Sequence, residues 1–387
     1  MFSSRMSNLH PYVPGEQPHD RVYIKLNANE NPYPPANEVV SAIQDMLLKN
    51  PKALSLYPDP DSQSLRASIA EMLNKTGGVL CRAEVLPDGK QCRPSEYDRI
   101  PFEVTRDMIY CGNGSDEVLS FVFYAFFDSD KTLVLPEHTY SFYPVYAGFY
   151  NIPFETVPLN EDWTLDTERL LKKAFENECG IIFANPNAPT ALGLTREKIR
   201  ALLKATDPNK VFVVDEAYCD FGGESSIPLL SEFKNLVVVR TFSKSLCGAG
   251  MRLGYLVANP KIINAVTTVK NSLNHFPLDA LAQAAGVAAA KNPAYYVDCA
   301  QKIVCERDSF IEFLRRKGWT VTDSQTNFVF ARHPSVSGAE VYRKIKEKGI
   351  LVRHFATKGI EDYIRITVGS HEEMTVLKNA IEKIEKL

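Results

Sequence analysis

Short apolar runs recur along residues 108–258, and they constrain the fold of this chain more than any other feature. They are rich in β-branched residues, they do not alternate strictly with polar residues, and the stretches between them are long enough for helices. Strands that are buried on both faces have this pattern. The sequence therefore predicts an α/β domain with a mainly parallel sheet and helices on both faces. The predicted strands are Met108–Cys111, Thr132–Leu135, Ile181–Ala184, Val211–Val214, Leu236–Val239 and Tyr255–Ala258, with a weaker one at Phe154–Val157.

The pattern changes after about residue 290, where a long charged amphipathic helix is followed by short strands separated by helical patterns. This change predicts a smaller α+β domain over residues 291–387. We assign residues 46–290 to the large domain, and residues 1–45 to an N-terminal arm and part of the small domain. A chain of 387 residues fits two domains. The polar, turn-rich stretch 81–105 is expected to be a surface excursion before the first strand of the sheet.

The composition favours a small-molecule partner. A net charge of −3 offers no basic surface for nucleic acid or an anionic membrane. The eight cysteines are scattered without zinc-like spacing, so we expect free thiols and no metal site. The first residues lack the apolar run of a signal peptide, and no apolar stretch is long enough to span a bilayer. We therefore expect a cytoplasmic protein.

The strongest local signal is Thr241-Phe242-Ser243-Lys244, which follows a predicted strand and precedes the glycine-rich stretch up to Arg252. A lysine held just beyond a buried strand, among small residues that let a ligand approach, can act as a nucleophilic amine. The alternative is that Lys244 is an ordinary surface lysine on a loop, but the surrounding glycines argue against it.

Two further loops follow predicted strands. Asp215 and Tyr218 come at the carboxyl end of the strand Val211–Val214, where ligands collect in open α/β sheets, although Asp215 could equally be a helix N-cap. The loop from Gly112 to Glu117 offers free backbone N–H groups at a helix start, which suits phosphate, although an ordinary capping box fits as well.

Together the three loops supply an amine, a carboxylate, a phenol and a phosphate cup. Pyridoxal 5′-phosphate (PLP) needs this set, since its aldehyde is captured by an amine, its ring nitrogen is kept protonated and its phosphate is anchored. With these residues in place, the chain resembles the fold-type I PLP-dependent aminotransferases. Within them, the segments 10–15, 26–32, 57–59 and 363–369 are similar to the histidinol-phosphate aminotransferase family.

The resemblance implies a role for each of these residues. Lys244 would carry the cofactor and move a proton, Asp215 would pair with the ring N–H, and Tyr218 would contact the ring oxygen. Further cofactor contacts are implied for Gly114, Ser115, Asp116, Tyr140, Thr241, Ser243, Arg252 and, from a neighbouring subunit, Tyr57. The substrate would be bound by Tyr12, Asn29, Arg353 and Arg365. A homodimer is therefore expected, with an amino donor and a phosphate-bearing keto compound as substrates.

One loop departs from the pattern of the family. Where the family reads Asn-Pro-Thr-Gly, this chain has an alanine, Ala188, in place of the asparagine that contacts the ring oxygen, and Ala191 in place of the glycine. We assign the missing contact to Asn187. The first hypothesis is transamination between glutamate and imidazole-acetol phosphate in histidine biosynthesis. The alternatives are an aromatic amino acid aminotransferase, a PLP-dependent phosphothreonine decarboxylase and a non-catalytic PLP-fold binding domain.

Overall fold

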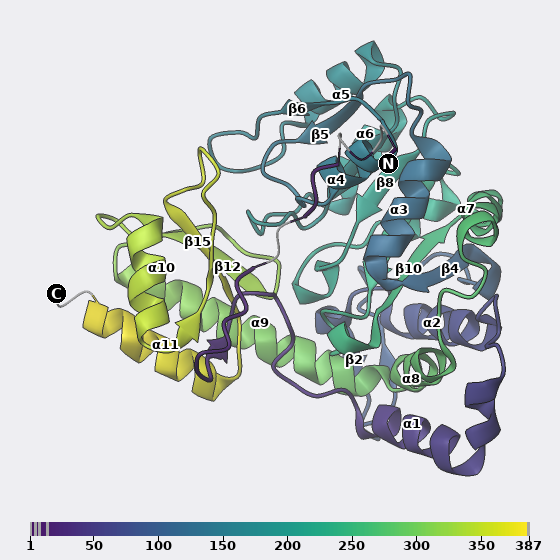
Figure 1. Ribbon diagram of the computed structural model, residues 1–387, viewed down its shortest axis with the longest axis horizontal. Coiled ribbons are helices and arrows are strands. Elements are labelled where there is room, and N and C mark those ends of the chain that lie inside the picture. The colour runs from purple at the N-terminus through teal and green to yellow at the C-terminus, as the bar shows by residue number, and fades with distance from the viewer. Residues whose placement is uncertain (1, 4–5, 7–8, 13–14, 385–387) are drawn as a thin grey trace.

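A computed structural model describes residues 2–3, 6, 9–12 and 15–384, and a seven-stranded sheet forms the centre of its larger part (Figure 1). The strand order is β4-β10-β9-β8-β7-β5-β6; β10 pairs antiparallel with both β4 and β9, and all other neighbouring strands of this sheet pair in parallel. The mainly parallel sheet is thus confirmed. The strands are β4 (Ile109–Asn113), β5 (Leu133–Pro136), β6 (Phe154–Val157), β7 (Ile181–Ala184), β8 (Phe212–Asp215), β9 (Leu236–Thr241) and β10 (Leu253–Ala258).

The central strands are buried on both faces, which explains their continuous apolar sequence. In β9, Leu236 and Val238 pack into one hydrophobic cluster, whereas Val237 and Val239 pack into another on the opposite face. Because successive side chains of a strand point to opposite faces, each cluster takes every second residue. Two layers of helices therefore enclose the sheet.

Helices from both sides of the large sheet form these two layers, and several helices of the chain begin at an ordinary N-capping residue. Helices α3, α4 and α7 supply residues to one cluster, and α2, α5, α6, α8 and α9 to the other. Asp166, Thr195, Asp279 and Ser337 each accept a backbone N–H bond at a helix N-terminus. No helix in the described ranges is long and apolar enough to cross a membrane. The helices are α1 (Asn37–Lys49), α2 (Gln63–Thr76), α3 (Gly114–Phe126), α4 (Tyr143–Phe149), α5 (Thr167–Glu176), α6 (Arg196–Ala205), α7 (Pro260–Leu273), α8 (Ala280–Lys291), α9 (Pro293–Arg316), α10 (Gly338–Glu347) and α11 (His371–Ile384).

A smaller unit is built on a four-stranded antiparallel sheet with the order β11-β12-β15-β14. Figure 1 shows α9 running from this unit to the large one, with α10 and α11 beside the small sheet. The N-terminal strand β1 (Ile24–Lys25) pairs with β13 (Ile350–Leu351), so residues near the start of the chain join this unit. The boundaries proposed for the two domains remain a prediction. The strands are β11 (Thr320–Val321), β12 (Phe328–Arg332), β14 (Arg353–His354) and β15 (Tyr363–Thr367).

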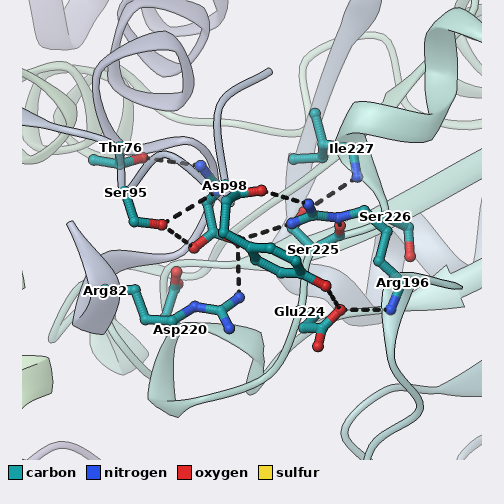
Figure 2. Close-up of polar contacts among 12 residues, drawn as sticks. Thr76, Arg82, Ser95, Asp98, Arg196, Asp220, Glu224, Ser225, Ser226 and Ile227 are labelled. Carbon is teal, nitrogen blue, oxygen red and sulfur yellow. Dashed lines mark hydrogen bonds and ion pairs between the residues drawn. The ribbon is translucent and has the colours of Figure 1, made fainter. Parts of the chain in front are cut away.

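The stretch 81–105 is more firmly anchored than a plain surface excursion. It carries a short hairpin of β2 (Glu84–Val85) and β3 (Cys92–Arg93), and Asp98 behind it is fully buried. The Asp98 carboxylate accepts hydrogen bonds from Arg82 and Arg196, both at 2.8 Å, and from Ser95 at 2.7 Å (Figure 2). A buried carboxylate needs such partners. The excursion is therefore tied to α6 of the large unit.

Candidate active site

A cavity of about 370 Å³ lies at the carboxyl ends of β7, β8 and β9. In parallel sheets of this kind, loops that leave the carboxyl ends of adjacent strands converge on one edge. Most of the residues predicted to bind the cofactor line this one cavity. They are Ser115, Asp116, Tyr140, Asp215, Tyr218, Thr241, Ser243, Lys244 and Arg252, accompanied by Ala28, Glu30, Ala184, Ala188, Ala217, Ala249 and Gly250.

Lys244 projects its amine into this cavity from the loop after β9. Its Nζ donates to the backbone oxygen of Ala28 at 3.2 Å and lies 5.6 Å from the centre of the Tyr218 ring. The backbone oxygen of Lys244 accepts a bond from Asn31 at 2.9 Å, which holds the loop against the N-terminal segment. No carboxylate of the described residues pairs with this ammonium group. The amine is therefore available to a ligand.

Asp215 ends β8 and is buried at the wall of the cavity. Its carboxylate accepts hydrogen bonds from the Tyr143 hydroxyl at 2.9 Å and from the Ala217 N–H at 3.2 Å. Burial raises the pKa of Asp215 from 3.8 to about 6, because the hydrogen bonds only partly offset the loss of solvation. Within the described chain this carboxylate has no cationic partner, so it suits a ligand that brings a positive charge.

The loop before α3 is the candidate anion cup. Gly114 has a left-handed φ of 75°, and a Cβ there would lie 2.6 Å from Nη2 of Arg252. A side chain at this position would therefore displace the guanidinium. Ser115 and Asp116 follow in the first turn of α3, where backbone N–H groups and the helix dipole favour an anion. Arg252 pairs with Asp116 at 3.0 Å at the mouth of the cup.

Two tyrosines frame the cavity. Tyr140 donates its hydroxyl hydrogen to Asp116 at 2.8 Å, and Tyr218 accepts a bond from the side-chain amide of Asn29 at 3.0 Å. Asn29 is buried and is itself bonded to Thr367 of β15. The predicted substrate residue Asn29 therefore lies beside the predicted cofactor residue Tyr218.

Asn187 does not reach the cavity, although it was expected to replace the missing asparagine. Its side-chain oxygen accepts a bond from Thr139 at 2.9 Å, and its amide donates to the backbone of His138 and to Thr190. These bonds hold the side chain against the neighbouring loop. Ala188 lines the cavity instead, with a methyl group that can neither donate nor accept. The assignment of Asn187 to the ring oxygen finds no support in this geometry.

The remaining predicted residues lie outside the cavity. Arg365 is close to it, because its Nη2 donates to the backbone oxygen of Asn27 at 3.1 Å and its guanidinium lies 5.3 Å from the centre of the Phe328 ring, which packs edge-on against Tyr218. Arg353 is the register partner of Arg365 on β14. The ring of Tyr12 packs 5.0 Å from that of Phe142. Tyr57 is 82% exposed and stacks on Phe276.

The sequence analysis missed Tyr143, which holds Asp215 from the start of α4. Tyr140 lies before the start of α4, so no helical spacing in the sequence links it to Tyr143. It also missed the small residues of the cavity wall, among them Ala28 and Ala184. They carry no polar atom on the side chain, so no chemical argument from sequence singles them out.

The residues present fit PLP. An unpaired amine, a buried carboxylate without a cation and a helix N-terminus with an arginine surround one cavity, and these match the aldehyde, the ring nitrogen and the phosphate of this cofactor. Among the residues that the structure describes, no group of three or more His, Cys, Asp or Glu side chains is arranged to hold a metal ion.

Known proteins of one family match nearly the whole chain. The sequence profile of the family described as aminotransferase class I and II matches residues 21–384. The histidinol-phosphate aminotransferase of Syntrophus aciditrophicus is 43% identical over 385 residues, covering 99% of this chain and 98% of the relative. That of Chromohalobacter salexigens is 40% identical, with coverage of 99% and 98%.

Solved structures share the fold. The histidinol-phosphate aminotransferase of Sinorhizobium meliloti, in complex with pyridoxal-5′-phosphate, superposes with a TM-score of 0.81 at 23% identity, over 99% of this chain and 97% of that one. A mutant of Thermus thermophilus aspartate aminotransferase gives 0.79 at 19% identity, over 100% and 99% of the two chains. The fold is that of the fold-type I aminotransferases, which are PLP-dependent enzymes. The chain belongs to the aminotransferase class I and II family, among the histidinol-phosphate aminotransferases.

Proposed function

We propose that this chain binds PLP on Lys244 and transfers an amino group from glutamate to imidazole-acetol phosphate, in the direction of histidine biosynthesis. The observation that carries the proposal is the convergence of Lys244, Asp215 and the cup at Gly114–Asp116 on one cavity. When bound, PLP supplies an electron sink for the charge that develops at the substrate Cα. The chain's own residues hold this group, position the substrate and move the proton.

Lys244 has two tasks in this proposal. Its uncharged amine would hold the cofactor through the aldehyde, and the same Nζ would carry the proton that leaves the substrate Cα. Asp215 would keep the ring nitrogen protonated through an ion pair, which would remove the free-energy cost of burying its charge alone. Tyr218 would donate to the ring oxygen, while Asn29 fixes its hydroxyl group.

The cofactor phosphate is assigned to the N-terminus of α3 and to the side chains beside it. Backbone N–H groups and the arginine fork bind phosphate oxygens without requiring a metal ion. Tyr140 would pack against the ring face. The phosphate contacts are assigned to Gly114, Ser115, Asp116, Thr241, Ser243 and Arg252.

The substrate's anionic groups are assigned to Arg365, with Arg353 and Tyr12 as helpers. Burial lowers the pKa of Arg365, and the neighbouring charge of Arg353 adds to this effect. Arg353 and Arg365 have no carboxylate partner among the described residues, so a bound anion would reduce the repulsion between their charges. Both the carboxylate of glutamate and a phosphate ester meet this need.

The substrate assignment draws its support from full-length relatives about 40% identical that carry the name histidinol-phosphate aminotransferase. Its test is the ratio of kcat/KM for histidinol phosphate to that for phenylalanine and tyrosine. We expect histidinol phosphate to be favoured by at least about 100-fold, the range that charged recognition groups provide. A preference for the aromatic acids, or release of carbon dioxide from phosphothreonine, would overturn it.

We further propose that the enzyme is a homodimer in the cytoplasm. Tyr57 lies far out on the surface and outside the cavity of its own chain, which is compatible with a role in the site of a second subunit. Gel filtration of the active enzyme tests this, and an active monomer would contradict it.

A further inference from the structure

The segment from Asp215 to Asp220 presents two different faces. Asp215 and Tyr218 line the cavity, whereas Glu216 and Asp220 point their carboxylates to the opposite side. Both of these carboxylates contact the same guanidinium, that of Arg240 in β9. Arg240 therefore connects Glu216 and Asp220 on the side of the segment that faces away from the cavity.

Arg240 is almost fully buried and uses its whole guanidinium group. Its Nη2 lies 2.9 Å from Oε2 of Glu216 and its Nη1 lies 3.3 Å from Oδ1 of Asp220. The same group donates to the backbone oxygen of Gly78 at 2.5 Å and to Oγ of Ser225 at 3.1 Å. Arginine suits such a site because its planar fork satisfies several acceptors at once. Arg240 thereby joins the segment 215–220 to the strand that leads to Lys244.

Asp220 extends this connection to the lysine loop. Its Oδ2 accepts a hydrogen bond of 2.5 Å from Oγ of Ser245, the residue that follows Lys244. Its Oδ1 accepts the backbone N–H of Leu80 at 3.0 Å, at the start of the 81–105 excursion. One carboxylate thus contacts the lysine loop, the strand before it and the segment that leads into the excursion.

We infer that Asp220 is a positioning residue for Lys244, acting through Ser245 and held in place by Arg240. The inference rests on the role proposed above for Lys244. Lys244 forms no ion pair with a described residue, so the direction of its amine is set by the hydrogen bond to Ala28 and by the backbone of its loop. Asn31 bonds this loop to the N-terminal segment, and Ser245 bonds it to Asp220 on the core side. Without the bond from Ser245, the loop and the Lys244 amine would be more mobile. A displacement of the reacting amine by about 1 Å can lower the rate about 100-fold.

The fully buried carboxylate of Asp98 provides a control. Like Asp220, Asp98 accepts from arginine and serine side chains, here two arginines and one serine, as Figure 2 shows, but its partners Arg82, Arg196 and Ser95 do not contact the lysine loop. The variants Asp98→Asn and Ser95→Ala therefore remove the same chemical groups at a distance from Lys244. A merely structural role for Asp220 predicts that the two pairs of variants behave alike.

The experiment compares Asp220→Asn and Ser245→Ala with Asp98→Asn and Ser95→Ala in the cofactor-loaded enzyme. For the first pair we expect kcat to fall about tenfold with KM within about twofold, since positioning acts mainly on the reacting geometry. The pH midpoint of the visible cofactor band should also shift, downward for Asp220→Asn, because the charge of Arg240 is then less compensated. The second pair should lower thermal stability but leave kcat and this midpoint unchanged.

Hydrogen exchange in the cofactor-free protein supplies a measurement that does not depend on PLP. Amides of residues 242–248 should exchange about tenfold faster in Ser245→Ala than in the parent or in Ser95→Ala. Ser245→Ala removes one hydroxyl group and is expected to fold even if Asp220→Asn does not. Unchanged exchange, or equal spectra and kcat in both pairs, would overturn the inference. If Lys244 does not carry PLP, the parent enzyme itself shows no visible band, so the two failures are distinguishable.

Discussion

Arg353 and Arg365 are register partners on the antiparallel strands β14 and β15, and neither forms an ion pair with any residue in the described part of the chain. Arg365 keeps only a bond to the backbone oxygen of Asn27, and its Nε is buried without a partner. A buried donor without a partner raises the free energy of the protein. We therefore propose that the two arginines form a site for an anion.

Replacing Arg365 tests the anion site. We expect Arg365→Ala to lower kcat/KM for histidinol phosphate by about 100-fold or more, since a charged hydrogen-bonded contact to substrate contributes about 2–5 kcal/mol. Lys358→Ala, at an exposed position, is the control and should stay within about twofold of the parent. Steady-state kinetics with both substrates varied measures this. Equal losses in the two variants would refute the assignment.

The raised pKa of Asp215 predicts a pH-dependent stability difference in the cofactor-free protein. Between pH 3.8 and about 6 the folded carboxyl holds a proton that the unfolded chain releases, so its contribution to stability is present below pH 3.8 and is lost as the pH rises through about 6. As the pH rises across this window, the free energy of unfolding of the parent should therefore fall by up to about 3 kcal/mol relative to that of Asp215→Asn. Urea unfolding of both proteins at pH 4.5, 6 and 7.5 measures the change. If the difference in free energy of unfolding between the two proteins does not change with pH, Asp215 is not a buried carboxylate without a cationic partner.

Because the side chain of Ala188 cannot form a hydrogen bond, Tyr218 is the residue that we propose donates to the ring oxygen. We expect Tyr218→Phe to raise the pH midpoint of the visible cofactor band and to lower kcat about tenfold, because a donor to a negatively charged oxygen favours the deprotonated form. Tyr124→Phe, an exposed tyrosine on α3, serves as control. A spectrophotometric pH titration gives the midpoints. If the midpoints of parent and Tyr218→Phe coincide, another group holds the ring oxygen.

Tyr57 allows a test of a shared site. Lys244→Ala and Tyr57→Ala subunits are each expected to be impaired, but a hybrid dimer contains one site with both residues intact if Tyr57 acts across the interface. After unfolding and refolding an equal mixture, activity should recover to about a quarter of the parent value, because half of the dimers are hybrids and each has one intact site. No recovery would mean that Tyr57 acts within its own chain or that no dimer forms.

The sequence predicted the parts of the fold that depend on local pattern. The apolar run at Ile181–Ala184 matches β7, because a strand buried on both faces leaves a continuous apolar signature. The weaker signal at Phe154–Val157 matches β6, an edge strand of which only Val157 is buried. The sheet position of β10 was not predictable in the same way. Its antiparallel pairing with β4 and β9 depends on contacts between segments far apart in the chain.

Site residues were predictable from the sequence where a reactive side chain directly follows a strand. They were not predictable where the direction of the side chain determines whether it reaches the cavity. Lys244 and Asp215 each follow a strand, and parallel strands bring their carboxyl ends together. Asn187 lies in the expected loop, yet Thr139 and His138 bind its amide outside the cavity. Asp98 looked like part of a surface turn, because nothing local shows that Arg196 lies 2.8 Å away. Such distances depend on tertiary packing, which a local pattern does not record.

Lys244 is the residue on which the whole account depends, and absorption spectroscopy tests it most directly. Purified parent protein supplied with PLP and then desalted should keep a visible band, since a covalent bond to the amine holds the cofactor through the column. Lys244→Ala, treated in the same way, should lose the band while its circular dichroism spectrum remains that of the parent. A parent protein that gains no band with PLP, or a variant that keeps the parent band, would contradict the account.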